Sequence, residues 1–424
     1  TTNSLCRVFS YIKNYPNLFN SLHSNDITTI VQDNNNDIWV ASYNAALTKL
    51  STNNYINSTI NKHRFMPGAI AYKKHLFMVL ETSIGGGVCR FNDQQLNTFE
   101  SITDSITGYY LYKSHDNKIY FGTNFYENLN KGGLWFTSLE EAVKLQKPNW
   151  ENITKEDGML LKNILTITED SLHRIWMAHP TKGVAYYDHK SKKCKTLLIE
   201  KNEIDFGALA SITDKYGNVW FGSSQKGLVV LKHPTYNINK NSFKPIQHPL
   251  LQNNSGTSFM QLFRDWIILG NDDKIILFNY KIWLEENKVV ARYLNPMETN
   301  FTSSTGQNTC MIDKRDSSVW FSTGNMLYQW NIKEWLQLPT YKVIPTVVIN
   351  GISLKENSTI TFPYNKNTLS VSVHYQSPDN MPRYISVALI AGNDSVLFSN
   401  PTITSNFTFS NLKSNQYKLY VQVC

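Results

Sequence analysis

Cysteine is scarce in this sequence and is never paired in a motif. The five cysteines of the 424-residue chain are Cys6, Cys89, Cys194, Cys310 and Cys424. None lies in a CxxC pair or in a cluster with histidines, so the sequence predicts neither a zinc site of that type nor a dense disulfide framework. Cys310 lies within an apolar run, which favours the role of a small core residue.

Long apolar runs and blocks of like charge are missing as well. No stretch reaches the ~18 uninterrupted apolar residues of a membrane helix, and none has the pattern of a signal peptide. Because residue 1 is threonine and not a start methionine, we expect the chain to be part of a longer protein. The net charge of +8 is spread along the chain, and basic segments such as residues 189–195 are typical of solvated turns. We therefore expect no nucleic-acid partner, whereas an anionic small ligand is compatible with the charge.

Catalytic and cofactor motifs are also absent. The sequence contains no HExxH, no G-x-S-x-G and no P-loop. Three glycines in residues 83–91 lie between two predicted strands, so they are typical of a hairpin turn and not of a phosphate-binding loop. The histidines are scattered, among them His63, His75, His115, His179 and His374. We predict no metal site, no cofactor and no catalytic residue.

The sequence does contain one motif that is repeated seven times. In DKYGNVWFGS (residues 214–223) a polar turn leads into an apolar burst around Trp220, a pattern typical of a β-hairpin. A large apolar residue occupies the equivalent position in every copy, although the second, third and sixth copies are degraded: Trp39, Phe77, Tyr120, Trp176, Trp220, Ile268 and Trp320. Six steps separate positions 39 and 320, which gives a mean period of about 47 residues. Such a period, with several strands per unit, is typical of propeller blades.

The repeat predicts an all-β fold that begins with a seven-bladed β-propeller over residues 1–340. Small residues such as Ala41 and Gly222 are expected to let neighbouring blades approach, while the large residue fills the space between them. Residues 4–14 form a strand without a hairpin partner, so we expect them to close the last blade. An insertion at residues 136–153 is predicted to include a short helix. The equivalent aspartates are predicted to cap turns by binding backbone amides: Asp33, Asp170, Asp214 and Asp313.

From residue 345 to residue 424 the repeat gives way to another pattern. Short alternating runs recur and are each expected to form a strand, among them TVVINGISL (residues 346–354), TITFP (residues 359–363), TLSVSVHYQS (residues 368–377) and YKLYVQV (residues 417–423). Six or seven short strands in about 80 residues predict an immunoglobulin-like β-sandwich. The Cys…Trp…Cys pattern of antibody domains is missing, and the chain stops on a strand, so we expect a domain that is cut close to its edge or truncated.

Both parts of the chain resemble one known family. The phrase D-x-x-[GN]-x-[IV]-W-[FVM]-[GA]-[ST], as in DKYGNVWFGS and DNNNDIWVAS, resembles the two-component regulator propeller repeat. The tail, with NTLSVSVHYQSP and RYISVALIAGNDSVLFS, resembles the Tyr-Tyr-Tyr domain that follows such propellers. This order is that of the extracytoplasmic sensor region of hybrid two-component systems and related one-chain receptors. The best-known members carry two seven-bladed propellers where this chain has one, and the usual tryptophan of the tail is replaced near Leu397 and Phe398.

Ligand binding is expected where the repeats differ, because a residue repeated once per blade is typical of the core between blades. The loops that lead into the first strands ring the mouth of the axial channel. Their side chains combine cations, amides and aromatic rings, a set suited to a polar or acidic saccharide. The candidate ligand-binding residues are His23, Asn25, His63, Arg64, Tyr109, Lys162, Asn163, Phe206, Thr257 and Gln307.

The resemblance implies the periplasmic or extracellular part of an inner-membrane receptor of signal transduction. In this interpretation the propeller binds a small solute, such as a glycan fragment, and the sandwich relays a rearrangement of a receptor homodimer to a membrane helix beyond Cys424. Two alternatives stay open. One is a propeller enzyme, a lyase or hydrolase acting on polysaccharide, and the other is a scaffold that binds proteins through its rim. No set of carboxylates and histidines meets at one mouth, so we expect the chain itself not to be an enzyme.

Overall fold

The computed structural model divides the chain into two compact units. The first comprises Thr1–Ile246 and Asn254–Leu336, and the second comprises Gln247–Asn253 and Gln337–Cys424. No helix among the described residues is long and apolar enough to cross a membrane. The structure describes residues 12–15, 27–43, 46–50, 55–59, 63–82, 85–92, 99–103, 106, 108–123, 132–161, 163–235, 237–248, 251, 256–271, 274–294, 305–323, 326–337, 345–355, 359–361, 368–375, 385–391, 395–398, 404–413 and 416–423.

The first unit consists of seven four-stranded antiparallel sheets, one for each copy of the repeat, numbered here 1 to 7 in chain order. The first strands are β2 (Ile27–Gln32), β6 (His63–Tyr72), β10 (Gly108–Lys113), β14 (Thr166–Glu169), β18 (Ala210–Thr213), β22 (Phe259–Phe263) and β26 (Thr305–Ile312). The second strands are β3 (Ile38–Ser42), β7 (His75–Thr82), β11 (Lys118–Thr123), β15 (Ile175–His179), β19 (Val219–Ser223), β23 (Trp266–Gly270) and β27 (Val319–Thr323). The third strands are β4 (Ala46–Leu50), β8 (Gly85–Asn92), β12 (Leu134–Ser138), β16 (Gly183–Asp188), β20 (Gly227–Leu231), β24 (Ile275–Asn279) and β28 (Met326–Trp330). The fourth strands are β5 (Tyr55–Thr59), β9 (Phe99–Ser101), β13 (Glu151–Ile153), β17 (Lys193–Leu198), β21 (Phe243–Pro245), β25 (Ala291–Leu294) and, in sheet 7, β1 (Ile12–Tyr15).

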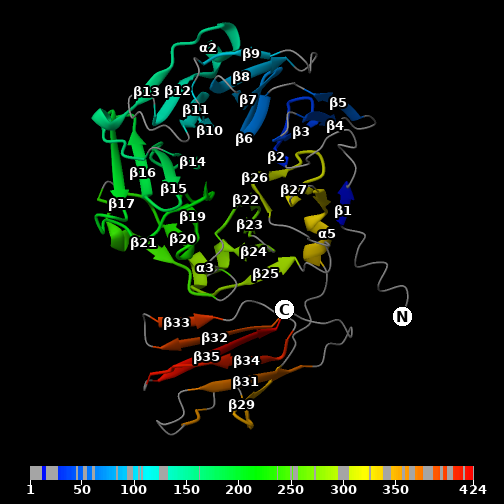
Figure 1. Ribbon diagram of the computed structural model, residues 1–424, viewed down its shortest axis with the longest axis vertical. Coiled ribbons are helices and arrows are strands. Elements are labelled where there is room, and N and C mark those ends of the chain that lie inside the picture. Colours follow the sequence, from blue (N-terminus) through cyan, green and yellow to red (C-terminus); the bar gives the residue numbers. More distant parts are fainter. Residues whose placement is uncertain are drawn as a thin grey trace. The chain divides into compact units, whose positions relative to one another are not determined.

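The seven sheets follow one another in a closed ring. Each first strand packs beside the first strand of the next sheet, and β26 packs beside β2. Figure 1 shows this succession around a common centre, from blue through green to yellow. β1 pairs with β28, with Ile12 opposite Trp330, so sheet 7 combines strands from the two ends of the unit. Residues 4–11 of the strand predicted to close the ring lie outside the described residues.

The repeated large residue lies in the second strand of every sheet and is buried. Its seven representatives are at most 4% exposed. In sheet 4, Trp176 contacts the edges of Phe221 and Phe243 of sheet 5, with ring centroids 5.8 and 6.3 Å apart. This confirms the prediction that the repeated aromatic packs between neighbouring sheets. Gly222 shows why a small residue is needed nearby, because a Cβ there would lie 2.4 Å from the Cβ of Thr257.

The aspartates of the repeat cap the turns between first and second strands, as predicted. Oδ1 of Asp214 accepts hydrogen bonds from the backbone N–H of Tyr216 (2.8 Å) and of Asn218 (3.0 Å). Its Oδ2 accepts the indole N–H of Trp220 across 2.8 Å. Corresponding backbone bonds are made by Asp33, Asp170 and Asp313. One side chain therefore fixes both the turn and the rotamer of the buried tryptophan.

Short helices lie between strands of the first unit. The insertion of sheet 3 contains α2 (Leu139–Lys144), which confirms the predicted helix. Ser138 caps it by accepting the N–H of Glu140, and Leu139 and Ala142 are buried. The other helices among the described residues of the unit are α3 (Tyr280–Glu286), α5 (Ile332–Gln337) and the 3₁₀ turns η1 (Lys155–Asp157) and η2 (Lys240–Ser242).

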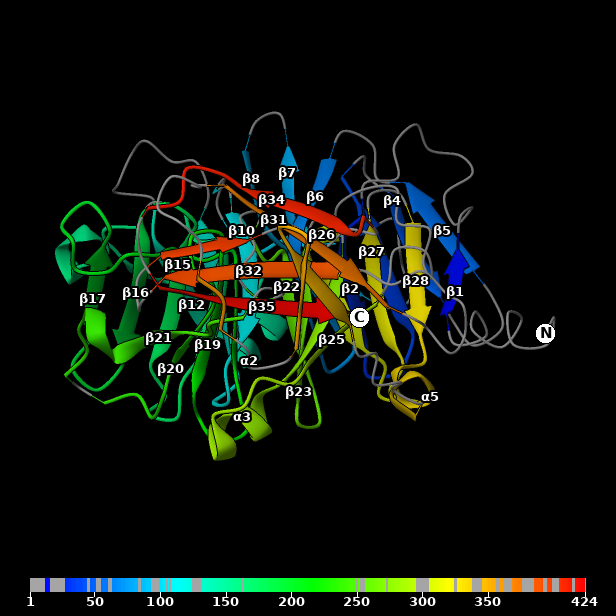
Figure 2. The ribbon, with the colours of Figure 1, turned by 90° about the horizontal axis from the view of Figure 1, so that it is seen from below.

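The second unit is made of two antiparallel sheets around one apolar core. The first sheet has the strand order β30-β29-β31-β34 and the second β33-β32-β35. Figure 2 shows β32 and β35 side by side and running in opposite directions. The core is drawn from both sheets and includes Val371, Val373, Val387, Leu389 and Phe407. The strands are β29 (Thr346–Ile349), β30 (Ile352–Leu354), β31 (Leu369–His374), β32 (Ile385–Ala391), β33 (Ser395–Phe398), β34 (Asn406–Phe409) and β35 (Tyr417–Val423).

Two runs of the tail differ from the expected strands. Residues 346–354 form a hairpin and not one continuous strand, because Asn350 and Gly351 adopt positive φ angles of 46° and 85° and reverse the chain. Residues 359–361, expected to begin a strand, are not in a strand.

Candidate ligand-binding site

Two of the predicted ligand-binding residues meet at the ends of the first strands. Tyr109 lies near the start of β10 in sheet 3, and Gln307 lies near the start of β26 in sheet 7. The Tyr109 hydroxyl donates a hydrogen bond to Oε1 of Gln307. Sheets 3 and 7 are not neighbours in the ring, so this bond joins strands across its centre. The amino-terminal ends of the first strands therefore converge, as expected from the sequence.

A second contact across the ring comes from Asn308, which the sequence analysis did not single out. Asn308 has a positive φ of 57° and lies where the pairing of β26 with β27 shifts register. Its backbone N–H donates to the Ser258 carbonyl (2.9 Å), and its side-chain amide donates to the Leu165 carbonyl (3.3 Å). Leu165 precedes β14 in sheet 4, so the irregular start of β26 reaches two other sheets.

One buried polar group at this site has no hydrogen-bond partner among the described residues. This group is Nε2 of Gln307. A buried amide N–H that makes no bond is costly, by about 1–3 kcal/mol, so a ligand acceptor placed there would be favoured. Burial also raises the pKa of Tyr109 to about 12, which keeps its hydroxyl protonated and able to donate at neutral pH.

The other predicted residues occupy different environments. Phe206 is 1% exposed and packs against Phe221 and Phe243, so it lies in the core between sheets 4 and 5. Thr257 is buried against Gly222, and Asn163 is half-buried just before β14. His63 and Arg64 lie in β6, but their side chains lie outside the described part of the structure, as do His23, Asn25 and Lys162 altogether.

The groups that meet here suit the recognition of a polar ligand through hydrogen bonds. Tyr109, Gln307 and Asn308 supply a phenol hydroxyl and two carboxamides, which both donate and accept hydrogen bonds and carry no charge. Such groups match the hydroxyls of a sugar, and the tyrosine ring adds an apolar surface. The cations expected at the site belong to the side chains that are not described, so the described groups favour no particular ligand charge.

A separate cluster lies at the opposite, carboxyl-terminal ends of two first strands. His115, Glu169 and His173 bring their ligand-type atoms within 4.8 Å of one another. Among the described residues this is the one group of three or more histidine, cysteine, aspartate or glutamate side chains with that property. The sequence analysis named His115 as one of several scattered histidines and missed the other two.

The ring of sheets defines an all-β protein of the propeller type. Comparison with known proteins identifies the kind of propeller repeat that the sequence contains. Residues 21–44 match the family model described as two component regulator propeller. Residues 21–44 therefore carry this repeat, and the resemblance of the sequence to the two-component regulator propeller repeat is confirmed. No curated protein matches the sequence significantly.

Two solved structures share the fold. The extracellular domain of a hybrid two component system from B. thetaiotaomicron is similar over 98% of this chain and 55% of its own, with a TM-score of 0.61 and 14% identity. This chain thus spans about half the length of that domain. YCF48 from Cyanidioschyzon merolae is similar over 76% of this chain and 99% of its own, with a TM-score of 0.53 and 10% identity. At such identities the similarity concerns the fold alone.

Proposed function

We propose that this chain is the extracytoplasmic, ligand-sensing region of a receptor for two-component signal transduction. The two component regulator propeller match and the fold shared with the extracellular domain of a hybrid two component system support this proposal. Residues 1–340 would form a seven-bladed propeller, each of the seven sheets being one blade. Residues 345–424 would form an immunoglobulin-like sandwich of the Tyr-Tyr-Tyr type.

The ligand we propose is a small polar solute, with an oligosaccharide fragment as the leading class. The observation that carries this choice is the convergence of Tyr109 and Gln307 across the ring, with the Gln307 amide N–H buried and unpartnered. A ligand hydroxyl that accepts this N–H satisfies a donor that finds no acceptor among the described residues.

Signalling requires that the ligand bind one arrangement of the receptor better than another. We propose that the second unit relays a change in a homodimer to a membrane helix that follows Cys424 in the full-length protein. A ligand with equal affinity for both arrangements would shift no population, however tightly it bound.

The direct test is a thermal-shift screen of the purified chain against neutral and anionic oligosaccharides. A ligand that binds only the folded state raises the free energy of unfolding by about 2.7 kcal/mol at 100 times its Kd. We expect Gln307→Ala to abolish the shift. Gln329→Ala is the matched control, because Gln329 lies in β28 of the same sheet and bonds to the hydroxyl of Ser318.

The outcomes separate the alternatives. Stabilisation that Gln307→Ala removes and Gln329→Ala keeps supports the sensor. Conversion of the oligosaccharide into shorter products would identify a lyase or hydrolase. Failure of every solute, together with binding of a protein partner, would favour the scaffold.

A further inference from the structure

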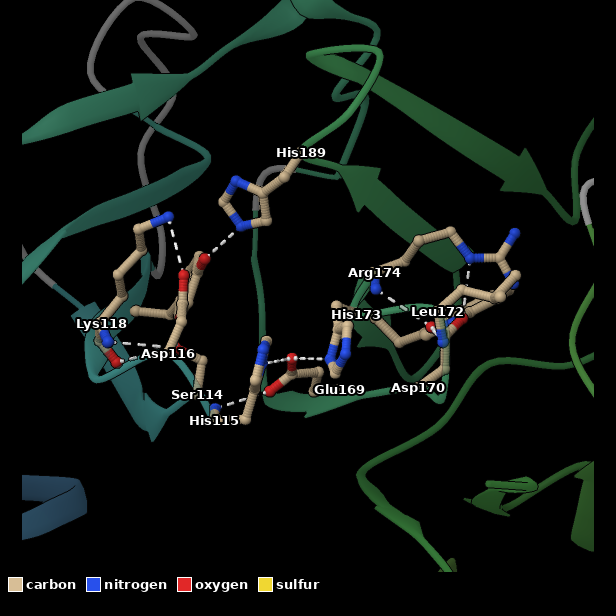
Figure 3. A network of polar contacts seen from close by, with 12 residues as sticks. Ser114, His115, Asp116, Lys118, Glu169, Asp170, Leu172, His173, Arg174 and His189 are labelled. Atoms are coloured by element: carbon tan, nitrogen blue, oxygen red, sulfur yellow. Dashed lines mark hydrogen bonds and ion pairs between the residues drawn. The ribbon is translucent and has the colours of Figure 1, made fainter. Parts of the chain in front are cut away.

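The cluster of His115, Glu169 and His173 joins two neighbouring sheets. His115 lies in the turn between β10 and β11 of sheet 3, whereas Glu169 ends β14 and His173 lies in the turn between β14 and β15 of sheet 4. Oε1 of Glu169 contacts Nδ1 of His115 and lies 3.0 Å from Nδ1 of His173. Figure 3 shows both imidazoles directed at the one carboxylate. Two repeats thus contribute three ligand-type atoms to one point.

The backbone of the turn that carries His173 is fixed independently of the three side chains. Oδ1 of Asp170 accepts the N–H groups of Leu172 and Arg174, which sets the turn that carries His173. Arg174 is 1% exposed and pairs with the same carboxylate through a 2.8 Å bond to Oδ2. His173 itself has a left-handed φ of 62°, which aims its side chain back over the end of β14. The position of His173 therefore follows from the fold of its turn.

The distribution of exposure suits an ion with one open side. The side chain of Glu169 is 8% exposed, whereas those of His115 and His173 are 52% and 58% exposed. Oε2 of the carboxylate is already held by the backbone N–H of His115 across 2.9 Å. The carboxylate is thus buried and held in place, whereas the two imidazoles are exposed and solvent reaches the remaining side.

We propose that His115, Glu169 and His173 bind a divalent transition-metal ion of the zinc class, through two imidazole nitrogens and one carboxylate oxygen. Two histidines and one carboxylate are a ligand set that zinc uses where a coordination position stays open, and imidazole also suits nickel, cobalt and copper. The ion would replace the two Nδ1 protons that otherwise face Oε1 and would balance the charge of a buried carboxylate.

Binding requires only side-chain rotation. The two imidazole rings are stacked, with centroids 3.6 Å apart and an angle of 19° between planes. Ligands at about 2.0–2.1 Å from a tetrahedral zinc lie about 3.3–3.4 Å from one another. The three ligand-type atoms already lie within 4.8 Å of one another. Rotation of the two exposed imidazole rings would therefore move their nitrogen atoms by about an ångström to reach the distances that the ion requires. The ion would then cross-link sheets 3 and 4.

The test is metal binding by the intact chain after removal of bound metal with a chelator. We expect calorimetric titration with Zn²⁺ to give one ion per chain, and Co²⁺ to give the visible absorption of a low-symmetry site. His173→Asn is the decisive variant, because asparagine tolerates the left-handed turn but supplies no imidazole. Removing a residue that only hydrogen-bonds to a metal ligand costs about 10- to 100-fold in metal affinity. Because His173 would bind the metal itself, we expect His173→Asn to lower the affinity for Zn²⁺ by at least about 100-fold.

His233→Asn is the matched control. His233 is also an exposed histidine with a left-handed φ of 43°, but it lies outside the cluster. We expect it to bind Zn²⁺ as the unmodified chain does, and Glu169→Gln to lose affinity as His173→Asn does. The proposal would be overturned if the unmodified chain did not bind Zn²⁺. It would also be overturned if His173→Asn and His233→Asn bound Zn²⁺ with the same affinity. Melting temperatures measured in chelator show whether each variant is folded before metal is added.

Discussion

Trp176 donates its indole N–H to the carboxylate of Asp170, six residues earlier in the chain, across 2.7 Å. The same carboxylate receives two backbone N–H groups of the turn. The arrangement recurs with a 2.8 Å indole bond in two other sheets, for Trp39 with Asp33 and for Trp220 with Asp214. A single side chain thus links the turn, the second strand and the core between sheets, which explains why both residues recur together.

This link predicts a large loss of stability when the aspartate is removed. Asp214→Ala leaves the buried Trp220 indole and two backbone N–H groups of the turn without their acceptor. We expect the free energy of unfolding to fall by about 2–4 kcal/mol, since each unsatisfied buried donor costs about 1–3 kcal/mol. Denaturant unfolding measures the change. Asp205→Ala is the control, because Asp205 is exposed and makes only surface ion pairs, and it should change stability by less than about 0.5 kcal/mol.

The close approach of sheets 5 and 6 predicts a second effect. Gly222→Ala adds a Cβ 2.4 Å from the Cβ of Thr257, so the two sheets have to separate. We expect a loss of about 1–3 kcal/mol, the usual cost of overpacking a core. In a double-mutant cycle, Thr257→Gly should recover part of that loss. Strictly additive losses would show that the two residues do not limit each other.

The turn of sheet 7 predicts a dependence of stability on pH. Burial alone would raise the pKa of Asp313, but hydrogen bonds from Arg315 and from Gln32 outweigh it and hold the pKa below its ordinary value. A carboxyl whose pKa is lowered by folding stabilises the protein above its unfolded pKa of about 3.9. That stability is lost as the pH falls through the lower, folded pKa.

Asp313→Asn isolates this contribution. At pH 7 we expect the variant to be less stable by about 1.5–3 kcal/mol, the range for a hydrogen bond to a charged group. Unfolding measured from pH 7 down to about pH 2 should show a gap between the two proteins that narrows only below the unfolded pKa of about 3.9, because protonation of the unfolded aspartate then offsets the stabilised carboxylate of the folded state. A gap that stays constant over this range would contradict the assigned role of the Arg315 and Gln32 contacts.

The pairing of β1 with β28 predicts that the amino-terminal strand stabilises the whole ring. A chain that begins at residue 17 lacks β1 and leaves the outer edge of sheet 7 unpaired. We expect a lower melting temperature and a tendency to associate, since an open strand edge pairs with other chains. A chain that begins at residue 10 keeps β1 and serves as the control. Equal melting temperatures for the two would show that β1 does not close the ring.

Much of the fold could be predicted because the repeat fixes it locally. The spacing of the tryptophans indicated sheets of similar size, and in three copies the turn aspartate preceded the tryptophan by six residues. The indole bond between Trp220 and Asp214 was missed, although this recurring six-residue spacing was a signal for it. The hairpin at Asn350 and Gly351 was also marked by its Asn-Gly pair but was overlooked in a longer apolar run.

The candidate sites were harder to predict because they depend on contacts between repeats. The loop argument correctly placed Tyr109 and Gln307 at one end of the ring but gave no sign that they bond across it. It also included Phe206, which the neighbouring sheets bury. His115 and His173 lie in the same turn of successive repeats, and Glu169 ends the strand before the second turn. Comparing equivalent turns of neighbouring copies would have revealed that cluster, whereas scanning for spaced ligands along the chain did not.

The central claim is that the amino-terminal ends of the first strands bind the ligand of a receptor. Hydrogen–deuterium exchange of the chain with and without the oligosaccharide that stabilises it most tests this claim directly. We predict that added protection is concentrated at the starts of β10 and β26, around Tyr109 and Gln307, and is lost in Gln307→Ala. Protection confined to other strands, or unchanged by Gln307→Ala, would contradict the account.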